Sequence, residues 1–203
     1  MKRIFDFFAS LIGIVLLSPV FLVAALLVKC SSRGPVFFRQ KRVGYGGKEF
    51  YIHKFRTMYV EGQRSLMEIT VKNDSRITPV GVYLRRSKID EIPQLFDVLL
   101  GNMSLVGPRP EVSRYVAYYP DEMRNIIFTV KPGITDLASI KYRDENNLLS
   151  ASDNPEETYI RRILPKKLRY YKFYVERHSM SLDLYVLCKT IEALFPSKKD
   201  DRK

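Results

Sequence analysis

Hydrophobic residues are concentrated near the start of the chain, where they form a continuous apolar run. Residues 7–28 read FFASLIGIVLLSPVFLVAALLV and include no charged side chain. At 1.5 Å per residue, a helix of this length is about 30 Å long, which is enough to match the hydrocarbon core of a bilayer. The pattern predicts that this segment lies in a membrane.

A proline near the middle of the run predicts a bend. Pro19 lacks a backbone donor and clashes with the preceding turn, and the Ser18 hydroxyl is placed to donate to a carbonyl that the proline leaves free. Basic residues flank the run on both sides, with Lys2 and Arg3 before it and Lys29, Arg33, Arg39, Lys41 and Arg42 after it. Because basic flanks favour the cytoplasmic side, we expect a re-entrant helix broken at Ser18 and Pro19.

Two alternatives to the re-entrant helix stay open. One is a helix that crosses the membrane completely, since proline is tolerated inside membrane helices. The other is a cleaved signal peptide, which the length of the run and the basic residues after it disfavour.

The pattern after the apolar run predicts a short β-hairpin. Apolar residues on either side of a glycine-rich turn at 44–47 have the aromatic character typical of strands, namely Val36, Phe37, Phe38, Phe50, Ile52 and Phe55. Residues 29–56 contain eight basic side chains and one acidic side chain, Glu49. Such a face suits an anionic membrane lipid surface.

Helical patterns dominate the remaining sequence. We expect a helix from about Glu91 to Leu100, ended by Gly101, and another with Pro110 in its first turn. Residues 60–77 have no clear period and are interpreted as a helix and a loop.

The C-terminal part predicts two long helices. Residues 156–177 mix basic and aromatic side chains, which fits either an interfacial helix or a helix with one face in the core. Residues 182–195 place apolar side chains at steps of three and four, so we expect one buried face formed by Leu184, Leu187, Cys188, Ile191, Leu194 and Phe195.

These elements predict an α+β fold that is predominantly α. We expect a re-entrant membrane helix at 1–30, a small globular, membrane-associated domain with interfacial amphipathic helices at 31–196, and a disordered tail at 197–203. A chain of 203 residues has room for one core of this kind.

The charge of the chain indicates a polyanionic neighbour. Lys and Arg number 34 against 22 acidic residues, for a net charge of +12. Nucleic acid, anionic lipid and a phosphorylated substrate all fit this charge. The two cysteines, Cys30 and Cys188, have no zinc-site spacing and are expected to be reduced, and His53 and His178 are isolated, so a histidine metal site is not expected.

The segment SKIDEIPQL contains the strongest candidate for chemistry, the acidic pair Asp90 and Glu91. A following proline fits the first turn of a helix, so we expect Asp90 at or near the N-cap, where the helix dipole favours a carboxylate or a phosphate. Two carboxylates beside a phosphate would suit Mg²⁺, and a carboxylate can attack phosphorus as a nucleophile. The alternative is a simple helix cap. Basic residues available to the site are Lys54, Arg56, Arg85, Arg86, Lys88 and Arg109.

Several motifs occur in the order typical of one family. They are Lys2-Arg3 with Asp6, the Ser18-Pro19 break, GPVFFRQKRVG at 34–44, KFRTM at 54–58, LRRSKIDEIPQLFDVLLGNMSLVGPRPE at 84–111 and PGIT at 132–135. On these motifs the sequence resembles the monotopic phosphoglycosyl transferases, the bacterial sugar transferase family, from about residue 2 to residue 195.

The resemblance implies a reaction and a location. Enzymes of this family move a phosphosugar from a UDP-sugar to polyprenol phosphate, here expected to be undecaprenyl phosphate, and produce UMP and a polyprenol diphosphate-sugar. The reaction begins the assembly of a membrane glycan. It takes place at the cytoplasmic face of the bacterial inner membrane, in which the protein is monotopic.

The resemblance also implies roles for individual residues. Asp90 corresponds to the nucleophile that takes the phosphosugar covalently, and Glu91 to its partner, with Mg²⁺ held at this pair. The expected phosphate-binding residues are Arg85, Arg109, Lys54 and Arg56.

The sequence departs from a common family pattern after PGIT. Many members continue with Gly-Leu-Ala-Gln, whereas this chain reads DLASIKYRDENN. Nucleotide or sugar contacts are therefore expected to differ here, with Asp136 and Arg143 as the main candidates and Ser139, Asp144 and Glu145 beside them.

A second class of function also fits the composition. A non-catalytic membrane-surface scaffold or a polyanion-binding module would explain the positive charge and the interleaved Tyr and Phe residues. It would not explain the acidic pair or the ordered motifs, and we do not expect nucleic acid as a partner. The sequence makes no prediction of oligomeric state.

Overall fold

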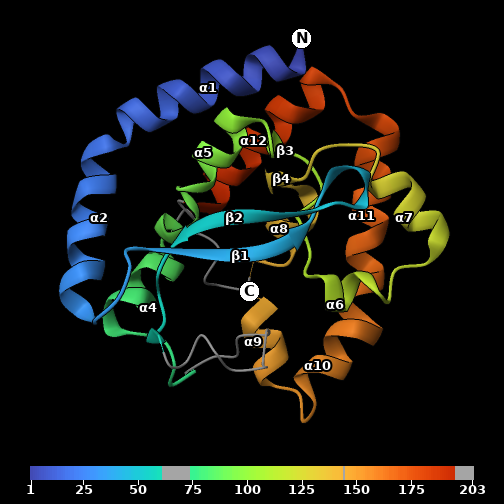
Figure 1. The fold of residues 1–203 in the computed structure, drawn as a ribbon. Coiled ribbons are helices and arrows are strands. Elements are labelled where there is room, and N and C mark those ends of the chain that lie inside the picture. Colours follow the sequence, from blue (N-terminus) through green and yellow to red (C-terminus); the bar gives the residue numbers. More distant parts are fainter. Residues whose placement is uncertain (61–73, 144, 195–203) are drawn as a thin grey trace.

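The computed structural model describes residues 1–60, 74–143 and 145–194, which form a mostly helical domain with two small sheets (Figure 1). The α-helices are α1 (Lys2–Leu16), α2 (Ser18–Ser31), α4 (Pro79–Arg86), α5 (Gln94–Leu100), α6 (Ser113–Val116), α7 (Asp121–Ile127), α8 (Leu137–Lys141), α9 (Glu145–Ser150), α10 (Pro155–Thr158), α11 (Leu164–Arg177) and α12 (Met180–Leu194). The strands are β1 (Phe37–Val43), β2 (Glu49–Phe55), β3 (Ser104–Val106) and β4 (Gly133–Thr135). Most of the segment expected to be a helix and loop at 60–77, and the tail expected at 197–203, lie outside the described residues.

The bend in the apolar run is confirmed. Helices α1 and α2 meet at an angle of 62° and form an arc along one side of the molecule (Figure 1). The Ser18 hydroxyl donates to the carbonyl of Val15 at 2.8 Å. Pro19 cannot donate to this carbonyl because proline has no backbone N–H. Among the described residues, no single helix is long and apolar enough to cross a bilayer, while the bent pair together reaches that length and composition.

The beginning of α1 is fixed to the globular domain by polar contacts. Arg3 donates to a carbonyl at the end of α5 at 2.7 Å. Asp6 is only 3% exposed and accepts a hydrogen bond from the Ser104 hydroxyl on β3 at 2.8 Å. Lys2 forms an ion pair with Asp183 of α12 at 2.6 Å. The polar residues that precede the apolar run therefore belong to the fold of the domain.

The end of α2 is fixed to the same domain. Ala24 and Val28 pack against Phe55 and Leu84 in a small apolar core. Beyond that core, the buried guanidinium of Arg56 donates to backbone carbonyls at the C-terminal end of α2 and just after it, those of Val28 at 3.3 Å, Ser32 at 2.7 Å and Arg33. Because the last carbonyls of a helix have no partner within it, Arg56 is the C-terminal cap of α2.

The predicted hairpin is confirmed. Strands β1 and β2 pair antiparallel, with Phe37 opposite Phe55 at the open end and Val43 opposite Glu49 at the turn. The turn contains a 3-10 helix, Tyr45–Gly47, in which Gly46 and Gly47 have φ values of 66° and 71°. Only glycine adopts this left-handed region without strain, so the two glycines fix the turn.

The second sheet was not predicted. Strands β3 and β4 pair parallel, and at their edge Gly107 and Gly133 come so close that a Cβ on Gly133 would lie 2.1 Å from the Gly107 nitrogen. Each strand has only three residues, too few to show an alternating pattern. The sheet places the GPRP loop beside β4.

The helix after the acidic pair begins later than predicted. We expected it from Glu91 with Asp90 at its cap, but α5 begins at Gln94, and Asp90 lies in a separate 3-10 turn, Ile89–Glu91. Lys88, the residue before this turn, has a φ of 59°. This left-handed conformation changes the direction of the chain between α4 and the turn. The predicted stop at Gly101 is confirmed by its φ of 88°.

The helix predicted to start at Pro110 is also displaced. Helix α6 begins at Ser113, because Glu111 pairs with Val43 through an isolated antiparallel bridge and keeps the chain extended there.

The two C-terminal helices differ in how well the sequence predicted them. Helix α11 has one face in the core, through Leu164, Leu168 and Tyr171, and the core alternative is therefore the correct one. For α12 the predicted buried face is wrong, since Leu184 and Ile191 are exposed. The helix instead turns Asp183 inward.

The ion pair of Asp183 explains the rotation of α12. Asp183 is buried, pairs with Lys2 and accepts a hydrogen bond from the Tyr174 hydroxyl at 2.6 Å. A carboxylate buried in this way needs both partners to offset its desolvation. Val186, three residues later, is then buried on the same face.

Replacing Arg56 by Met tests its role as the cap of α2. The change leaves the final carbonyls of α2 without a donor, so the free energy of unfolding should fall by about 3 kcal/mol. Chemical unfolding of the detergent-solubilised protein measures this. Arg33→Met, at the neighbouring exposed position, is the matched control and should change stability little; an equal loss in both variants would contradict the capping role.

Candidate active site

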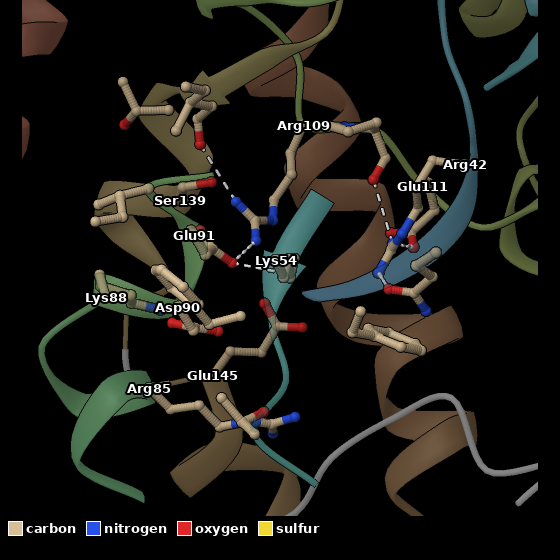
Figure 2. Close-up of a pocket in the computed structure, with 18 of the residues that line it drawn as sticks. Arg42, Lys54, Arg85, Lys88, Asp90, Glu91, Arg109, Glu111, Ser139 and Glu145 are labelled. Carbon is tan, nitrogen blue, oxygen red and sulfur yellow. Dashed lines mark hydrogen bonds and ion pairs between the residues drawn. The ribbon is translucent and has the colours of Figure 1, made fainter. Parts of the chain in front are cut away.

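One large cavity contains most of the candidate residues. It has a volume of about 900 Å³ and lies between the β1–β2 hairpin, the 3-10 turn with the acidic pair, the GPRPE loop and helices α8, α9, α11 and α12. Figure 2 shows Lys54, Arg109 and the acidic pair facing one another at one side of this cavity, with Arg42 and Glu111 at another. Segments far apart in the sequence therefore meet around one space.

Glu91 is held by two cations. Its Oε1 atom accepts from the Lys54 ammonium on β2 at 2.8 Å and from the Arg109 guanidinium in the GPRPE loop. Arg109 also donates to the carbonyl of Ile134 at 3.3 Å. Burial opposes ionisation of Glu91, but the charges of Arg109, Lys54 and Lys88 outweigh it and hold the pKa of Glu91 well below its ordinary value. Glu91 is therefore a permanently charged structural centre of the site.

The pKa values of the two cations, Lys54 and Arg109, shift in opposite directions. Burial lowers the pKa of Lys54, and the nearby Glu91 charge offsets part of that effect. The Glu91 charge is the main cause of a raised pKa for Arg109. Both are held by the same carboxylate oxygen.

Asp90 differs from its neighbour in having no strong partner. It is 7% exposed, and among the described residues no donor contacts its buried Oδ1 atom. Burial, together with the adjacent Glu91 charge, raises its pKa to about 6, while Lys54, Arg85 and Lys88 limit the rise. Asp90 is thus an ionised but poorly solvated carboxylate at neutral pH, and such a carboxylate is a stronger nucleophile than one held by several donors.

Arg85 completes the cationic side of the cavity. Its Nε atom donates to the Thr57 hydroxyl at 2.8 Å, which orients the guanidinium beside the acidic pair (Figure 2). Burial lowers the pKa of Arg85, and the charge of Asp90 opposes that effect. Three of the four expected phosphate-binding residues, Lys54, Arg85 and Arg109, therefore line one cavity.

Arg56 is the fourth expected phosphate-binding residue, and the structure places it elsewhere. Its Nη1 and Nη2 atoms donate to carbonyls at the end of α2, and Arg56 does not line the cavity. Within a strand, Lys54 and Arg56 would share a face because they are two positions apart. Strand β2 ends at Phe55, however, and Arg56, just past that end, is directed toward α2 and away from the acidic pair.

The candidates after PGIT also separate into two groups. Asp136 is 1% exposed and caps α8, accepting from the backbone nitrogens of Ala138 at 2.6 Å and Ser139 at 3.0 Å, and it does not line the cavity. Arg143 and Glu145 line the cavity, as does the Ser139 side of α8. Asp144 lies outside the described residues.

The sequence did not reveal a network around Glu111. Its Oε1 atom accepts from Arg42 at 3.1 Å and from the Val112 nitrogen at 3.0 Å, and its Oε2 atom accepts from the Tyr159 hydroxyl. Arg42 also donates to the Pro110 carbonyl at 3.2 Å. These contacts fix the loop that carries Arg109, and no local signal could show them because they join residues up to 69 positions apart in the chain.

The acidic pair fits a divalent cation that is shared with a substrate. Among the described residues, no group of three or more Asp, Glu, His or Cys side chains is arranged to hold a metal ion by itself. Two adjacent carboxylates, one with a buried oxygen free of donors, match the limited protein ligation that Mg²⁺ uses with phosphate oxygens and water. The residues present therefore suit Mg²⁺ bound together with a phosphorylated ligand.

A buried acid pair in a basic cavity is a candidate site for chemistry on an anionic ligand. The chain belongs to the bacterial sugar transferase family, whose model matches residues 1–197.

Individual relatives cover most of this chain. UDP-glucose:undecaprenyl-phosphate glucose-1-phosphate transferase of Xanthomonas campestris pv. campestris is 39% identical over 193 residues, which are 93% of this chain and 37% of that protein. UDP-N-acetylgalactosamine-undecaprenyl-phosphate N-acetylgalactosaminephosphotransferase of Aeromonas hydrophila is 35% identical over 195 residues, 95% and 43% of the two chains. Exopolysaccharide production protein PSS of Rhizobium leguminosarum bv. phaseoli is 36% identical over 199 residues, 94% and 93%. The chain thus spans about two fifths of the first two relatives and nearly all of the third.

Replacing Asp90 by Asn should stabilise the protein in a pH-dependent way. Because burial raises the pKa of Asp90, folding favours its neutral form, and the ionised form costs stability above pH 6. Asp90→Asn should raise the free energy of unfolding by about 3 kcal/mol at pH 8, and the gain should disappear as the pH falls from about 6 to 4.

Unfolding measured from pH 4 to pH 8 tests this. Asp153→Asn, at an exposed position, is the control and should show no such trend in that range. A gain for Asp90→Asn that is the same at every pH would show that Asp90 is not desolvated.

Proposed function

We propose that this protein transfers a phosphosugar from a UDP-sugar to polyprenol phosphate, with undecaprenyl phosphate as the expected carrier, and releases UMP. The observation that carries the proposal is Asp90, a buried carboxylate without a donor on Oδ1, beside cations that Glu91 holds in place. Membership of the bacterial sugar transferase family and the names of its relatives support the same reaction.

In the first step, a carboxylate oxygen of Asp90 attacks the phosphorus that bears the sugar. A bond forms between this oxygen and phosphorus, and the bond from phosphorus to the bridging oxygen breaks, so that UMP leaves with the bridging oxygen. Lys54, Arg85 and Arg109 line the cavity where negative charge develops on the phosphoryl oxygens.

In the second step, a phosphate oxygen of the polyprenol carrier attacks the same phosphorus. The bond from phosphorus to Asp90 breaks, the carboxylate is restored, and the polyprenol diphosphate-sugar leaves. A covalent route lets one cationic pocket receive two anionic substrates in turn, so it need not bind both at once. Parallel initial-rate patterns are expected, and intersecting patterns would favour a ternary complex.

Mg²⁺ is the cofactor that fits this proposal. Asp90 and Glu91 would hold it, and it would neutralise charge on the diphosphate of the donor. The cations that already engage Glu91 leave Asp90 as the carboxylate best placed for the reaction.

We propose a monotopic location on the cytoplasmic face of the bacterial inner membrane, with α1 and α2 as a re-entrant pair. Both ends of the pair are held by the same globular domain, through Asp6 at one end and Arg56 at the other. Exposed apolar side chains lie on both helices, including Ile12, Leu16, Leu22 and Leu26. A pair tied at both ends to one domain suits entry and exit through one leaflet.

Intact-protein mass spectrometry tests the reaction. Wild-type protein incubated with Mg²⁺ and UDP-sugars should gain the mass of one phosphosugar, and the rate of adduct formation should rise with pH through about 6 as Asp90 ionises. Asp90→Asn should form no adduct. If no UDP-sugar gives an adduct, and polyprenol phosphate elicits no UMP, a scaffold or polyanion-binding role replaces the proposal.

Cysteine labelling tests the location. In a background with Cys30 and Cys188 replaced by Ser, Ile4→Cys places a thiol on an exposed position at the start of α1. In Cys188→Ser alone, native Cys30 reports the end of α2. An impermeant reagent added to spheroplasts should label neither, whereas both should react in inverted vesicles; labelling of residue 4 in spheroplasts would instead indicate a helix that crosses the membrane.

A further inference from the structure

The cavity extends beyond the acidic pair into a region of different chemistry. On the side formed by α9, α11 and the π-helical stretch Tyr159–Ile163, its wall includes Tyr142, Glu145, Leu149, Tyr159 and Lys167. Aromatic rings and one pair of opposite charges replace the cluster of cations found beside Asp90. This region has no part in the chemistry proposed at phosphorus.

The charged pair in this region is unusually enclosed. Lys167 on α11 forms an ion pair with Glu145 on α9, and their side chains are only 9% and 21% exposed. The Lys167 ammonium also lies 5.0 Å from the centre of the Tyr159 ring. Removing two charges from water carries a large desolvation cost, and one ion pair and one ring contact offset it only partly. Remaining lone pairs and ammonium protons face a cavity where a ligand can satisfy them.

A carboxylate, an ammonium group and an aromatic ring in one pocket match a polyhydroxylated ligand. Each sugar hydroxyl both donates and accepts, so neighbouring hydroxyls can donate to a carboxylate and accept from an ammonium at the same time. The exposed edge and face of an aromatic ring can pack against the C–H groups of a sugar. A uracil base instead offers one N–H donor and carbonyl acceptors, for which a carboxylate is a poor partner beyond its single N–H.

We propose that Glu145 and Lys167 form a subsite that reads the hydroxyl groups of the sugar in the nucleotide-sugar donor. The inference rests on the proposed function, because the sugar is joined directly to the phosphorus that Asp90 attacks and must occupy the cavity next to it. Glu145 accepts from the sugar hydroxyls, and Lys167, positioned over the Tyr159 ring, donates to them. The pair therefore determines specificity and takes no part in bond making.

Sugar discrimination by Glu145→Gln tests the subsite. This variant keeps the shape and removes the charge, and it is compared with wild type using UDP-glucose, UDP-galactose, UDP-N-acetylglucosamine and UDP-N-acetylgalactosamine. We expect kcat/KM for the preferred sugar to fall about 10- to 100-fold, and the ratio between that sugar and its epimer at the 4-hydroxyl to shrink. Inhibition by UMP, which lacks the sugar, should stay within twofold of wild type.

Two further variants distinguish the loss of a sugar contact from a general loss of stability. Glu157→Gln changes an exposed acid on the neighbouring helix α10 and should leave both activity and discrimination unchanged. Lys167→Met, combined with Glu145→Gln, removes both charges, so no buried charge is left unpaired, and it should also lose discrimination. Thermal unfolding of each variant shows whether the fold is retained.

The outcomes separate the subsite from the reaction. If Glu145→Gln weakens UMP inhibition and leaves the ratio between epimers unchanged, the pair contacts the nucleoside and the proposal is overturned. If folded Glu145→Gln retains wild-type kcat/KM and discrimination, the pair is structural and the proposal is likewise overturned. If wild type transfers no sugar at all, the proposed function itself fails.

Discussion

The Glu91 carboxylate is the interaction on which the site depends. A 3-10 turn supplies the acid, a strand supplies Lys54 and a loop supplies Arg109, and the three segments converge on a single oxygen atom. Removal of either cation would leave a buried charge partly uncompensated, so the three segments hold their positions together. The same arrangement affects Asp90. The positive charge of Lys54 limits the rise in the pKa of Asp90, so that Asp90 can ionise, but the hydrogen bonds of Lys54 and Arg109 go to Glu91 and to the Ile134 carbonyl.

The active-site strand is also coupled to the apolar helix pair. Lys54 reaches the acidic pair, while Arg56, two residues later, reaches the end of α2. The last residue of the strand between them, Phe55, packs in the core that α2 shares with α4. A displacement of α2 would therefore act on the position of Lys54 through a stretch of three residues. The position of the helix pair and the geometry of the anion site are thus mechanically linked.

Features set by local chemistry could be predicted from the sequence, whereas features set by distant partners could not. Pro19 and Ser18 determine the break by themselves, the glycines at 44–47 determine a turn, and Gly101 ends α5 because it adopts a left-handed conformation. The roles of Arg56, Asp136 and Asp183 depend on which carbonyl, amide or ammonium the fold brings to each. The local pattern of the acidic pair fitted a helix cap as well as a reaction centre, and the ordered motifs of the family made the pair the candidate for chemistry. Its position at a helix start was wrong, since the left-handed Lys88 has no signature in the sequence.

The contacts of α1 set an order for the assembly of the molecule. Lys2 leaves the ribosome well before its partner Asp183, which lies 181 positions later in the chain. At synthesis rates of roughly 5–20 residues per second, on the order of ten seconds or more separates the two. Helix α1 therefore completes its docking only after α12 has emerged, and until then the nascent chain contains an apolar helix whose polar anchors at Lys2 and Asp6 lack their full set of partners.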